Sequence, residues 1–294
     1  MVKILFIVAL ALSSSVGIAQ SCIADSNVNS KKIFFELLEI KNSKPDQVYR
    51  IDLLKPDTLL LEEMREFILP LKNLNVFEAS SLKITELPNG FSKMPCLNKV
   101  VLRNNRIKEI PFELLQSKTL QRLDLSINMI DTISSKDLNG IHLSELLIQN
   151  QNVDKVYLKG GGDGSSKLKK LLLDNNALSI SADFFSFPNL LELSLNKCSI
   201  ESLPNLSECR RIQYLSIANN SIKSLSNELD HLNDLSFLDL SNNPISSLPE
   251  VLYTSNTLTY LDLRGTNIAS TLKERLLISQ KFSEANKFLQ IIWE

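Results

Sequence analysis

One short pattern of leucines repeats along almost the whole chain and limits what it can fold into. The pattern is Leu-x-x-Leu-x-Leu-x-x-Asn-x-Leu, in which another apolar residue often replaces Leu. Clear copies begin at residues 97, 120, 168, 212 and 235, and weaker copies begin at 48, 74, 143, 190 and 258. Successive copies start 22 to 26 residues apart. A period of this length, kept over nine steps, is typical of a solenoid of stacked units.

The spacing inside each copy predicts one short strand with a buried side and a solvent side. In Leu-x-Leu, both leucines point to the core and the residue between them points outward. Successive strands would stack in parallel about 4.8 Å apart, so that one concave sheet gains a strand with each copy. The Asn would bond the backbone where the chain leaves the sheet, which gives a ladder of Asn105, Asn128, Asn176, Asn220 and Asn243. We expect a weaker ladder at Leu82, Cys198 and Thr266.

This pattern resembles the leucine-rich repeat family over roughly residues 48–268. The resemblance implies an α/β solenoid, a leucine-rich repeat horseshoe with a parallel concave sheet and a helical or 3₁₀ convex side. Leu-Pro or Ile-Pro pairs downstream of many copies resemble the short-repeat bacterial and plant-type subclasses. The family is a scaffold for many unrelated ligands, so the resemblance implies a macromolecular partner without naming it. A glycine-rich segment, residues 159–167, lengthens one copy and is expected to form a flexible loop.

The start of the chain predicts export. Lys3 precedes an apolar run over residues 4–12, and small residues follow up to Ala19, so residues 1–19 are expected to be a signal peptide. The protein would then be secreted, periplasmic or held at the cell surface. Cys22 gives an alternative, lipidation as the first residue of a bacterial lipoprotein, although the residues before it match the usual signal poorly. No later stretch reaches 18 consecutive apolar residues, so no transmembrane segment is predicted.

Both ends of a solenoid need caps, because an open end exposes apolar core and a sheet edge. Residues 20–47 are expected to form an N-terminal helical cap in which Ser30 caps a helix. Residues 269–294 are expected to form the C-terminal cap, with a final strand near residues 288–293. Its helix would start at a capping box, formed by Thr271 and Glu274, and carry the apolar residues Leu272, Leu276, Leu277 and Phe282. Caps bounded by cysteines are missing from the sequence, which favours a bacterial origin.

Composition excludes several classes of function. With 32 Lys and Arg against 33 Asp and Glu, the chain lacks the basic face that nucleic acid or an anionic membrane selects. Two histidines, His142 and His231, are too few for a His-based metal cluster. The four cysteines are spread out without a CxxC motif, so we expect neither a disulfide framework nor structural zinc. No metal or other cofactor is predicted.

The outward residues of the predicted sheet point to a binding surface near its C-terminal end. One residue per strand forms a column, which runs Arg50, Val76, Lys99, Arg122, Glu145, Lys170, Glu192, Tyr214, Phe237 and Tyr260. The first seven are mostly charged, whereas the last three are aromatic and consecutive. Aromatic side chains are enriched at protein interfaces. We therefore predict that Tyr214, Phe237 and Tyr260, with the neighbouring Asp239 and Asp262, bind a protein or a glycan.

Three other functions compete with this hypothesis. Asp239 and Asp262 occupy equivalent positions on adjacent strands, about 5 Å apart, which resembles the carboxylate pair of a retaining glycosidase. An open sheet, however, supplies no pocket that would set their two pKa values apart, so catalysis is disfavoured. Calcium binding at the same pair is a further alternative. The other competing function is structural, a cell-envelope protein without a specific ligand. The oligomeric state is not predicted.

Overall fold

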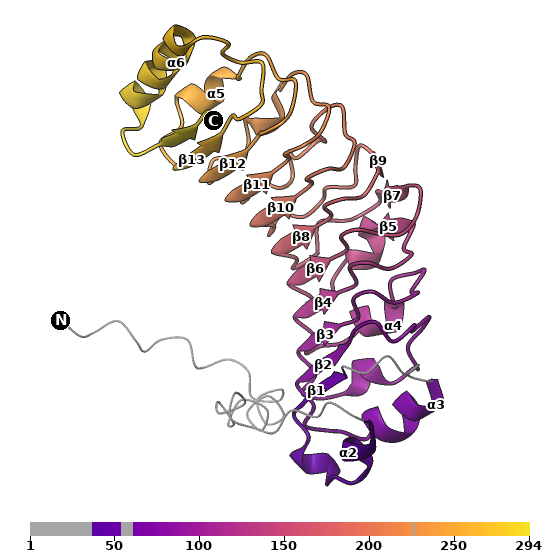
Figure 1. Cartoon of the computed structure of the whole chain (residues 1–294). Helices are drawn as coiled ribbons and strands as arrows, with labels where there is room; N and C mark the ends of the chain where they lie inside the picture. The colour runs from indigo at the N-terminus through magenta and orange to yellow at the C-terminus, as the bar shows by residue number, and fades with distance from the viewer. Residues whose placement is uncertain (1–36, 54–60, 226) are drawn as a thin grey trace, which may run out of the picture.

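Each copy of the repeat places one short strand on the inner side of a curved solenoid (Figure 1). The computed structural model describes residues 37–53, 61–225 and 227–294. The predicted signal peptide, the lipidation site at Cys22 and most of the predicted N-terminal cap lie outside the described residues. The boundaries set at residues 19, 47 and 268 remain predictions.

Eleven parallel strands form the concave sheet, which confirms the predicted architecture. When neighbouring strands pair, residues at equivalent positions of the repeat stand opposite one another; Leu215, for example, is opposite Leu238. The leucine pattern therefore sets the register. In spatial order the strands are β1 (Arg50–Leu53), β2 (Val76–Ala79), β3 (Lys99–Val101), β4 (Arg122–Asp124), β6 (Glu145–Leu147), β8 (Lys170–Leu172), β10 (Glu192–Ser194), β11 (Tyr214–Ser216), β12 (Phe237–Asp239), β13 (Tyr260–Asp262) and β14 (Gln290–Ile292).

The convex side consists of single turns of helix and, in the middle of the arc, a second sheet (Figure 1). The helical turns are α2 (Leu37–Lys41), η2 (Pro45–Gln47), α3 (Leu61–Glu63), η3 (Met64–Ile68), η4 (Phe91–Lys93), α4 (Phe112–Leu115), η5 (Ser135–Leu138), η6 (Asn227–Leu229) and α5 (Glu250–Tyr253). The second sheet was not predicted and comprises β5 (Thr132–Ser134), β7 (Val156–Lys159) and β9 (Leu178–Ile180). Its strands come from three consecutive repeats and pair in parallel. Each strand is a short run in which apolar and polar residues alternate.

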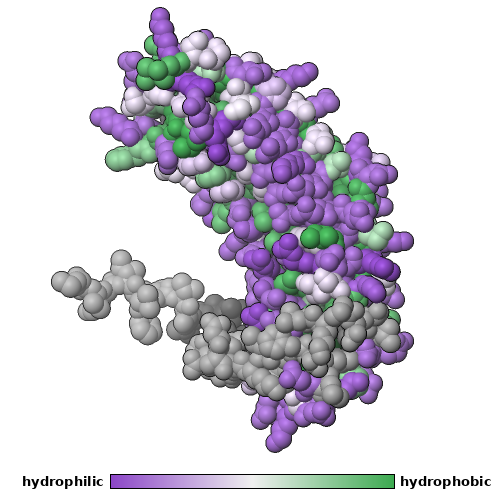
Figure 2. Space-filling view, viewed as in Figure 1, coloured by the Kyte–Doolittle hydropathy of each residue, from purple (hydrophilic) through white to green (hydrophobic). Residues whose placement is uncertain are grey.

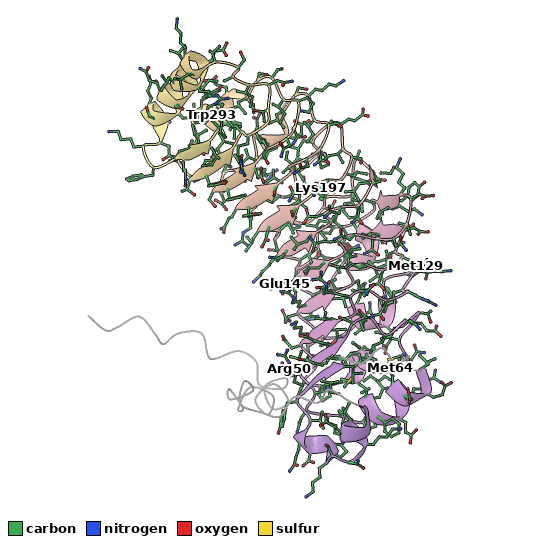
Figure 3. The ribbon with its side chains drawn as sticks, viewed as in Figure 1. Arg50, Met64, Met129, Glu145, Lys197 and Trp293 are labelled. Carbon is green, nitrogen blue, oxygen red and sulfur yellow. The ribbon has the colours of Figure 1, made fainter. Side chains whose placement is uncertain are left out.

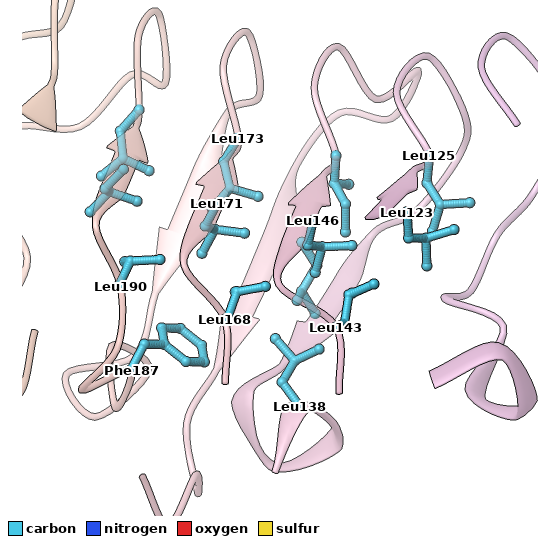
Figure 4. Close-up of a cluster of buried hydrophobic side chains, with 14 of the residues drawn as sticks. Leu123, Leu125, Leu138, Leu143, Leu146, Leu168, Leu171, Leu173, Phe187 and Leu190 are labelled. Atoms are coloured by element: carbon cyan, nitrogen blue, oxygen red, sulfur yellow. The ribbon is translucent and has the colours of Figure 1, made fainter. Parts of the chain in front are cut away.

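The core lies between the two sides and is filled by the repeating leucines. Leu123, Leu125, Leu146 and Leu171 have no exposed surface and point to the same side of their strands (Figure 4). On the convex side Phe184 and its neighbouring phenylalanines meet edge to face, with ring centroids 5.0 to 6.4 Å apart. Buried side chains from successive repeats together form one continuous core along the solenoid.

The predicted asparagine ladder is present and joins each repeat to the one before it. The Asn128 amide nitrogen donates to the carbonyl oxygens of Leu102 at 2.9 Å and Leu125 at 2.9 Å, while its oxygen accepts from the backbone of Ile107 at 3.0 Å. Asn105, Asn176, Asn220 and Asn243 make the same kind of bridge. Gln151 continues it through its longer side chain. Because the nitrogen and the oxygen of each amide are both hydrogen-bonded, the amide joins two turns of the solenoid and its burial costs little free energy.

Where another residue replaces Asn, the ladder changes as its chemistry dictates. At Cys198 the ladder is weaker, as expected, because a thiol, which is a weak donor with one hydrogen, replaces the amide and donates to the carbonyl oxygen of Leu173 at 3.3 Å. Thr266 bonds only within its own turn, to Leu263 at 2.7 Å. The expected local irregularity appears in the backbone at Leu82 and Cys198. The residues on both sides of each have a positive φ: Ser81 and Lys83 around Leu82, and Lys197 and Ser199 around Cys198.

The C-terminal end carries the predicted helix and final strand, but the helix packs differently from expectation. Helix α6 (Leu272–Ala285) begins with the Thr271–Glu274 capping box, and β14 extends the concave sheet. Only Phe282 is buried, against the ring of Tyr253 at 4.6 Å. Leu272, Leu276 and Leu277 are instead 72%, 63% and 58% exposed, and hydrophobic side chains are visible at this end in Figure 2. The helix thus packs on the last repeat through the single buried side chain of Phe282.

The cysteines also depart from expectation. Cys96 is disulfide-bonded, and its partner lies outside the described residues. Cys198 and Cys209 are free and buried. Burial raises the pKa of each of these two thiols to about 12, so both stay protonated at neutral pH.

The glycine-rich segment is anchored rather than free-standing. The backbone amide of Gly161 donates to the Asp183 carboxylate at 3.1 Å, and that of Gly162 donates to the Ser135 hydroxyl at 3.0 Å. A side chain at Gly160 would collide with Asp183, only 1.8 Å from where its Cβ would lie. These amides are occupied by neighbouring repeats and leave no free cradle for an anion.

The buried leucines give a direct test of this architecture. Leu125 and Leu240 are fully buried in the middle of the array, so replacing either by Ala should lower the free energy of unfolding by roughly 2–5 kcal/mol. The matched control is Leu276→Ala on the exposed face of α6, with an expected change of about 0.5 kcal/mol or less. Urea denaturation followed by circular dichroism measures both. Equal effects at the buried and exposed positions would contradict the described packing.

Candidate functional site

The outward column on the concave face divides into a charged part and an aromatic part, as predicted from the sequence. In the charged part, partners lie on adjacent strands: Arg122 pairs with Glu145 at 2.8 Å, and Lys170 pairs with Glu192 at 2.7 Å. Arg50 and Glu145 are labelled on this face in Figure 3. Arg50 and Lys99 pair with Asp52 and Glu78, which lie at the neighbouring outward position of their strands. The charges of this part are therefore balanced locally, and the surface offers little net field to a partner.

Tyr214, Phe237 and Tyr260 form a stack that we call the aromatic ladder. They stand opposite one another on β11, β12 and β13 because these strands pair in register. The ring centroids of Tyr214 and Phe237 are 4.0 Å apart with planes 9° from parallel, and those of Phe237 and Tyr260 are 4.5 Å apart at 2°. Tyr214 is 36% exposed, and the other two are half-buried. The ring edges and the Tyr214 hydroxyl therefore face solvent along the sheet, whereas the Tyr260 hydroxyl donates to the Asp262 carboxylate at 3.4 Å.

Asp239 and Asp262 lie opposite each other beside the ladder, but their surroundings differ. The Asp262 side chain is buried and held by Arg264, whose Nη2 is 2.6 Å from one carboxylate oxygen and whose Nε bonds both oxygens at 3.0 Å. Asp239 is half-buried and accepts from the backbone of Ser241 at 2.9 Å. Because Asp262 is fully engaged by a guanidinium, this pair does not offer the two available carboxylates that glycoside hydrolysis needs.

A hydrogen-bonded polar chain, which sequence reasoning missed, continues from Asp239 towards the middle of the sheet. The Ser216 hydroxyl contacts Asp239 at 3.4 Å and donates to the Asn196 side-chain oxygen at 2.8 Å. Asn196 bonds Ser194, whose hydroxyl donates to the Asp174 carboxylate at 2.6 Å. The available signal was Asp174 and Asn196 at the same repeat position, directly after the second strand leucine.

The concave surface near the ladder raises the pKa of Tyr214. Burial is the main cause, followed by the negative charges of Asp239, Glu192 and Asp174. The pKa of Tyr260 is raised by burial and by Asp262, and Arg264 opposes this effect. Both hydroxyls are therefore protonated at neutral pH. That of Tyr260 donates to the Asp262 carboxylate at 3.4 Å, and that of Tyr214 can donate a hydrogen bond to a partner.

Chemistry of other kinds finds little support in the described part of the chain. No group of three or more His, Cys, Asp or Glu side chains there could hold a metal ion. A depression of about 350 Å³ at the strand exits of the first half is lined by amides such as Asn104 and Asn150 and contains no ionisable side chain. The free thiols are buried. Among the described helices, none is long and apolar enough to cross a membrane.

Comparison with known proteins agrees with the fold. Residues 234–254 match the family model described as Leucine Rich Repeat. Osteomodulin from Rattus norvegicus is 28% identical over 172 residues, and osteomodulin from Bos taurus is 28% identical over 175 residues. Each alignment covers 56% of this chain and 39% of osteomodulin, so the matched region is well under half of those proteins.

Two solved structures share the architecture. One is the ectodomain of the membrane receptor kinase GASSHO1/SCHENGEN3 from Arabidopsis thaliana, with 24% identity, a TM-score of 0.52, and coverage of 74% of this chain and 26% of that one. The other is the plant peptide hormone receptor RGFR1, with 17% identity, a TM-score of 0.52, and coverage of 80% and 42%. The repeat, the sheet and these likenesses give the chain the fold of a leucine-rich repeat solenoid.

The electrostatics of the ladder can be tested on one tyrosine. Asp239→Asn should lower the pKa of Tyr214, because it removes a negative charge that disfavours the phenolate, while burial keeps the pKa above its ordinary value. Nuclear magnetic resonance of ring-labelled tyrosine, followed during a pH titration, measures the shift. Asp124→Asn, on the distant strand β4, is the control and should leave this pKa unchanged. An unchanged pKa in Asp239→Asn would place Asp239 away from the ladder.

Proposed function

We propose that this chain is a non-enzymatic binding module that recognises a protein through the aromatic ladder on its concave face. The observation that carries the proposal is a row of three aromatic side chains, partly open to solvent, on a sheet whose other outward residues are mostly charged and paired with one another. Tyr and Phe provide large contact areas with few rotatable bonds, as hot spots of interfaces do.

The stacking geometry favours a protein over a glycan. A sugar packs its flat apolar side on the face of an aromatic ring, but in this ladder the internal faces are covered by the neighbouring rings, 4.0 and 4.5 Å away. The positively polarised ring edges and the hydroxyl tips are what a partner meets. These suit backbone carbonyls and mixed side chains of a protein.

Other proteins of this fold support a peptide-like partner. The GASSHO1/SCHENGEN3 ectodomain was solved in complex with CASPARIAN STRIP INTEGRITY FACTOR 2, and RGFR1 was solved in complex with RGF2. Absence of catalysis is part of the proposal: Asp262 is sequestered by Arg264, and the described cysteine thiols outside the disulfide are buried and protonated.

The ladder can be tested by selection from a random peptide display library. Immobilised mature protein should enrich peptides that bind it at least about tenfold more weakly once Tyr214, Phe237 and Tyr260 are all replaced by Ala, a loss of about 1.4 kcal/mol. The charge-neutral control, Arg122→Ala with Glu145→Ala, alters the same column outside the ladder and should leave binding unchanged. Circular dichroism checks that both variants fold.

Two outcomes of this selection would count against the proposal. Peptides that bind the parent and the triple variant equally well would move the site away from the ladder. Glycans on an array that bind the parent but not the triple variant, with no ladder-dependent peptide, would replace the protein by a carbohydrate ligand.

We also propose that the protein is exported and that the signal peptide is cleaved after Ala19. The disulfide at Cys96 supports an oxidising compartment. Mass spectrometry of the protein purified from cells that process it should give a mature chain starting at Gln20. A mass increased by acyl groups on Cys22 would instead show lipid anchoring, and retention of residues 1–19 would contradict export through this signal.

A further inference from the structure

The carboxylates of the concave face are almost all neutralised within the molecule. Among the described residues on this face, six carboxylates lie within 4.0 Å of a Lys or Arg nitrogen, namely Asp52, Glu78, Asp124, Glu145, Glu192 and Asp262. Asp174 and Asp239 have no such partner among the described residues and bond only neutral groups. The two unpaired charges thus lie at the two ends of the polar chain that runs beside the ladder.

Three equivalent aspartates show that the missing cation is particular to one repeat. Asp124, Asp239 and Asp262 occupy the same position of the pattern, and each accepts a hydrogen bond from the backbone amide two residues later, at 3.0, 2.9 and 3.1 Å. The first has Arg103 at 3.6 Å and the last has Arg264 at 2.6 Å. Arg103 lies in the repeat before that of Asp124, whereas Arg264 lies in the same repeat as Asp262. The corresponding residues around Asp239 are Ala218 and Ser241, and neither is basic.

Both unpaired carboxylates are held in place by neutral donors. One oxygen of Asp174 accepts from the Ser194 hydroxyl and from the Asn196 backbone amide at 2.7 Å, and the other accepts from the Gln149 side-chain nitrogen. Asp239 is contacted by the Ser216 hydroxyl. Such bonds orient a carboxylate without cancelling its charge. The negative charges of Asp174 and Asp239 act on the aromatic ladder, because both help to raise the pKa of Tyr214, although burial is the larger cause. A partner that docks here without a cation would strip water from Asp239 and leave the charge unpaired.

We propose that the segment bound by the aromatic ladder is a basic peptide stretch of another protein. Its Lys or Arg head pairs with Asp239 while its aliphatic stem packs on Tyr214 and Phe237, and a second basic residue reaches Asp174. Long basic side chains suit this arrangement because their stems are apolar and their heads are charged, and Arg can bond a carboxylate through two nitrogens. The inference rests on the proposed function and adds the chemistry of the ligand.

The same peptide selection tests this inference separately from the ladder itself. Clones whose binding depends on the ladder should contain more Lys and Arg than the unselected library. Their affinity should fall about tenfold or more in the double variant Asp174→Asn with Asp239→Asn, and should weaken as salt is raised in the parent. Asp124→Asn is the matched control, with the same chemical change and the same backbone bond at a distant strand, and should leave affinity unchanged.

The outcomes separate the two proposals. Ladder-dependent clones that are neutral or acidic, or that bind the double variant and the parent equally, would overturn the basic ligand and leave the proposed function standing. Failure to obtain any ladder-dependent clone would overturn both. If the double variant does not fold, the single variant Asp239→Asn and the salt dependence of the parent still decide the question, because a neutral ligand would respond to neither.

Discussion

The buried amide ladder is the interaction on which the rest of this structure depends. Each Asn bridges the loop of its own repeat and the carbonyl of the preceding one, as Asn243 does with Leu240 and Ile217. This bridge aligns β12 on β11, so that Tyr214 and Phe237 face one another. Between β12 and β13, where Thr266 bonds only within its own turn, strand pairing keeps the same register and places Phe237 opposite Tyr260. A slip of one residue would turn Phe237 towards the core and Leu238 towards solvent.

Most of the fold and the arrangement of the aromatic ladder could be predicted from the sequence, because a repeat places residues one period apart next to one another in space. The register of Tyr214, Phe237 and Tyr260 follows from leucine positions alone. The remaining features depend on contacts between unlike positions. Nothing in the pattern indicated that Arg264 would fold back on Asp262, that Cys198 would serve as a ladder donor, or that α6 would bury Phe282 and expose its leucines. Such outcomes depend on rotamers and on packing at the ends, where the periodicity stops.

Local charge pairing shapes the concave face as much as the aromatic residues do. Along most of the sheet, long basic and acidic side chains from adjacent strands satisfy one another, which gives a soluble surface without a strong field. The pairing is interrupted at β11 to β13, where aromatic rings replace the long side chains. Asp262 is still paired with Arg264 there, but Asp239 has no cationic partner among the described residues. Recognition would thus arise from the place where the self-complementary pattern is interrupted.

The one-dimensional connectivity also determines how the molecule would respond to force. Backbone hydrogen bonds between repeats join residues about one period apart, from 20 residues for Leu178 with Cys198 to 31 for Gln290 with Thr259. Among the described residues no such bond ties one end of the arc to the other, so pulling on the ends would load each interface in series. The chain would lengthen by detaching repeats from an end while the remaining solenoid stayed folded. The aromatic ladder lies on β11 to β13, close to the C-terminal end of the sheet. These three strands would therefore separate early under tension.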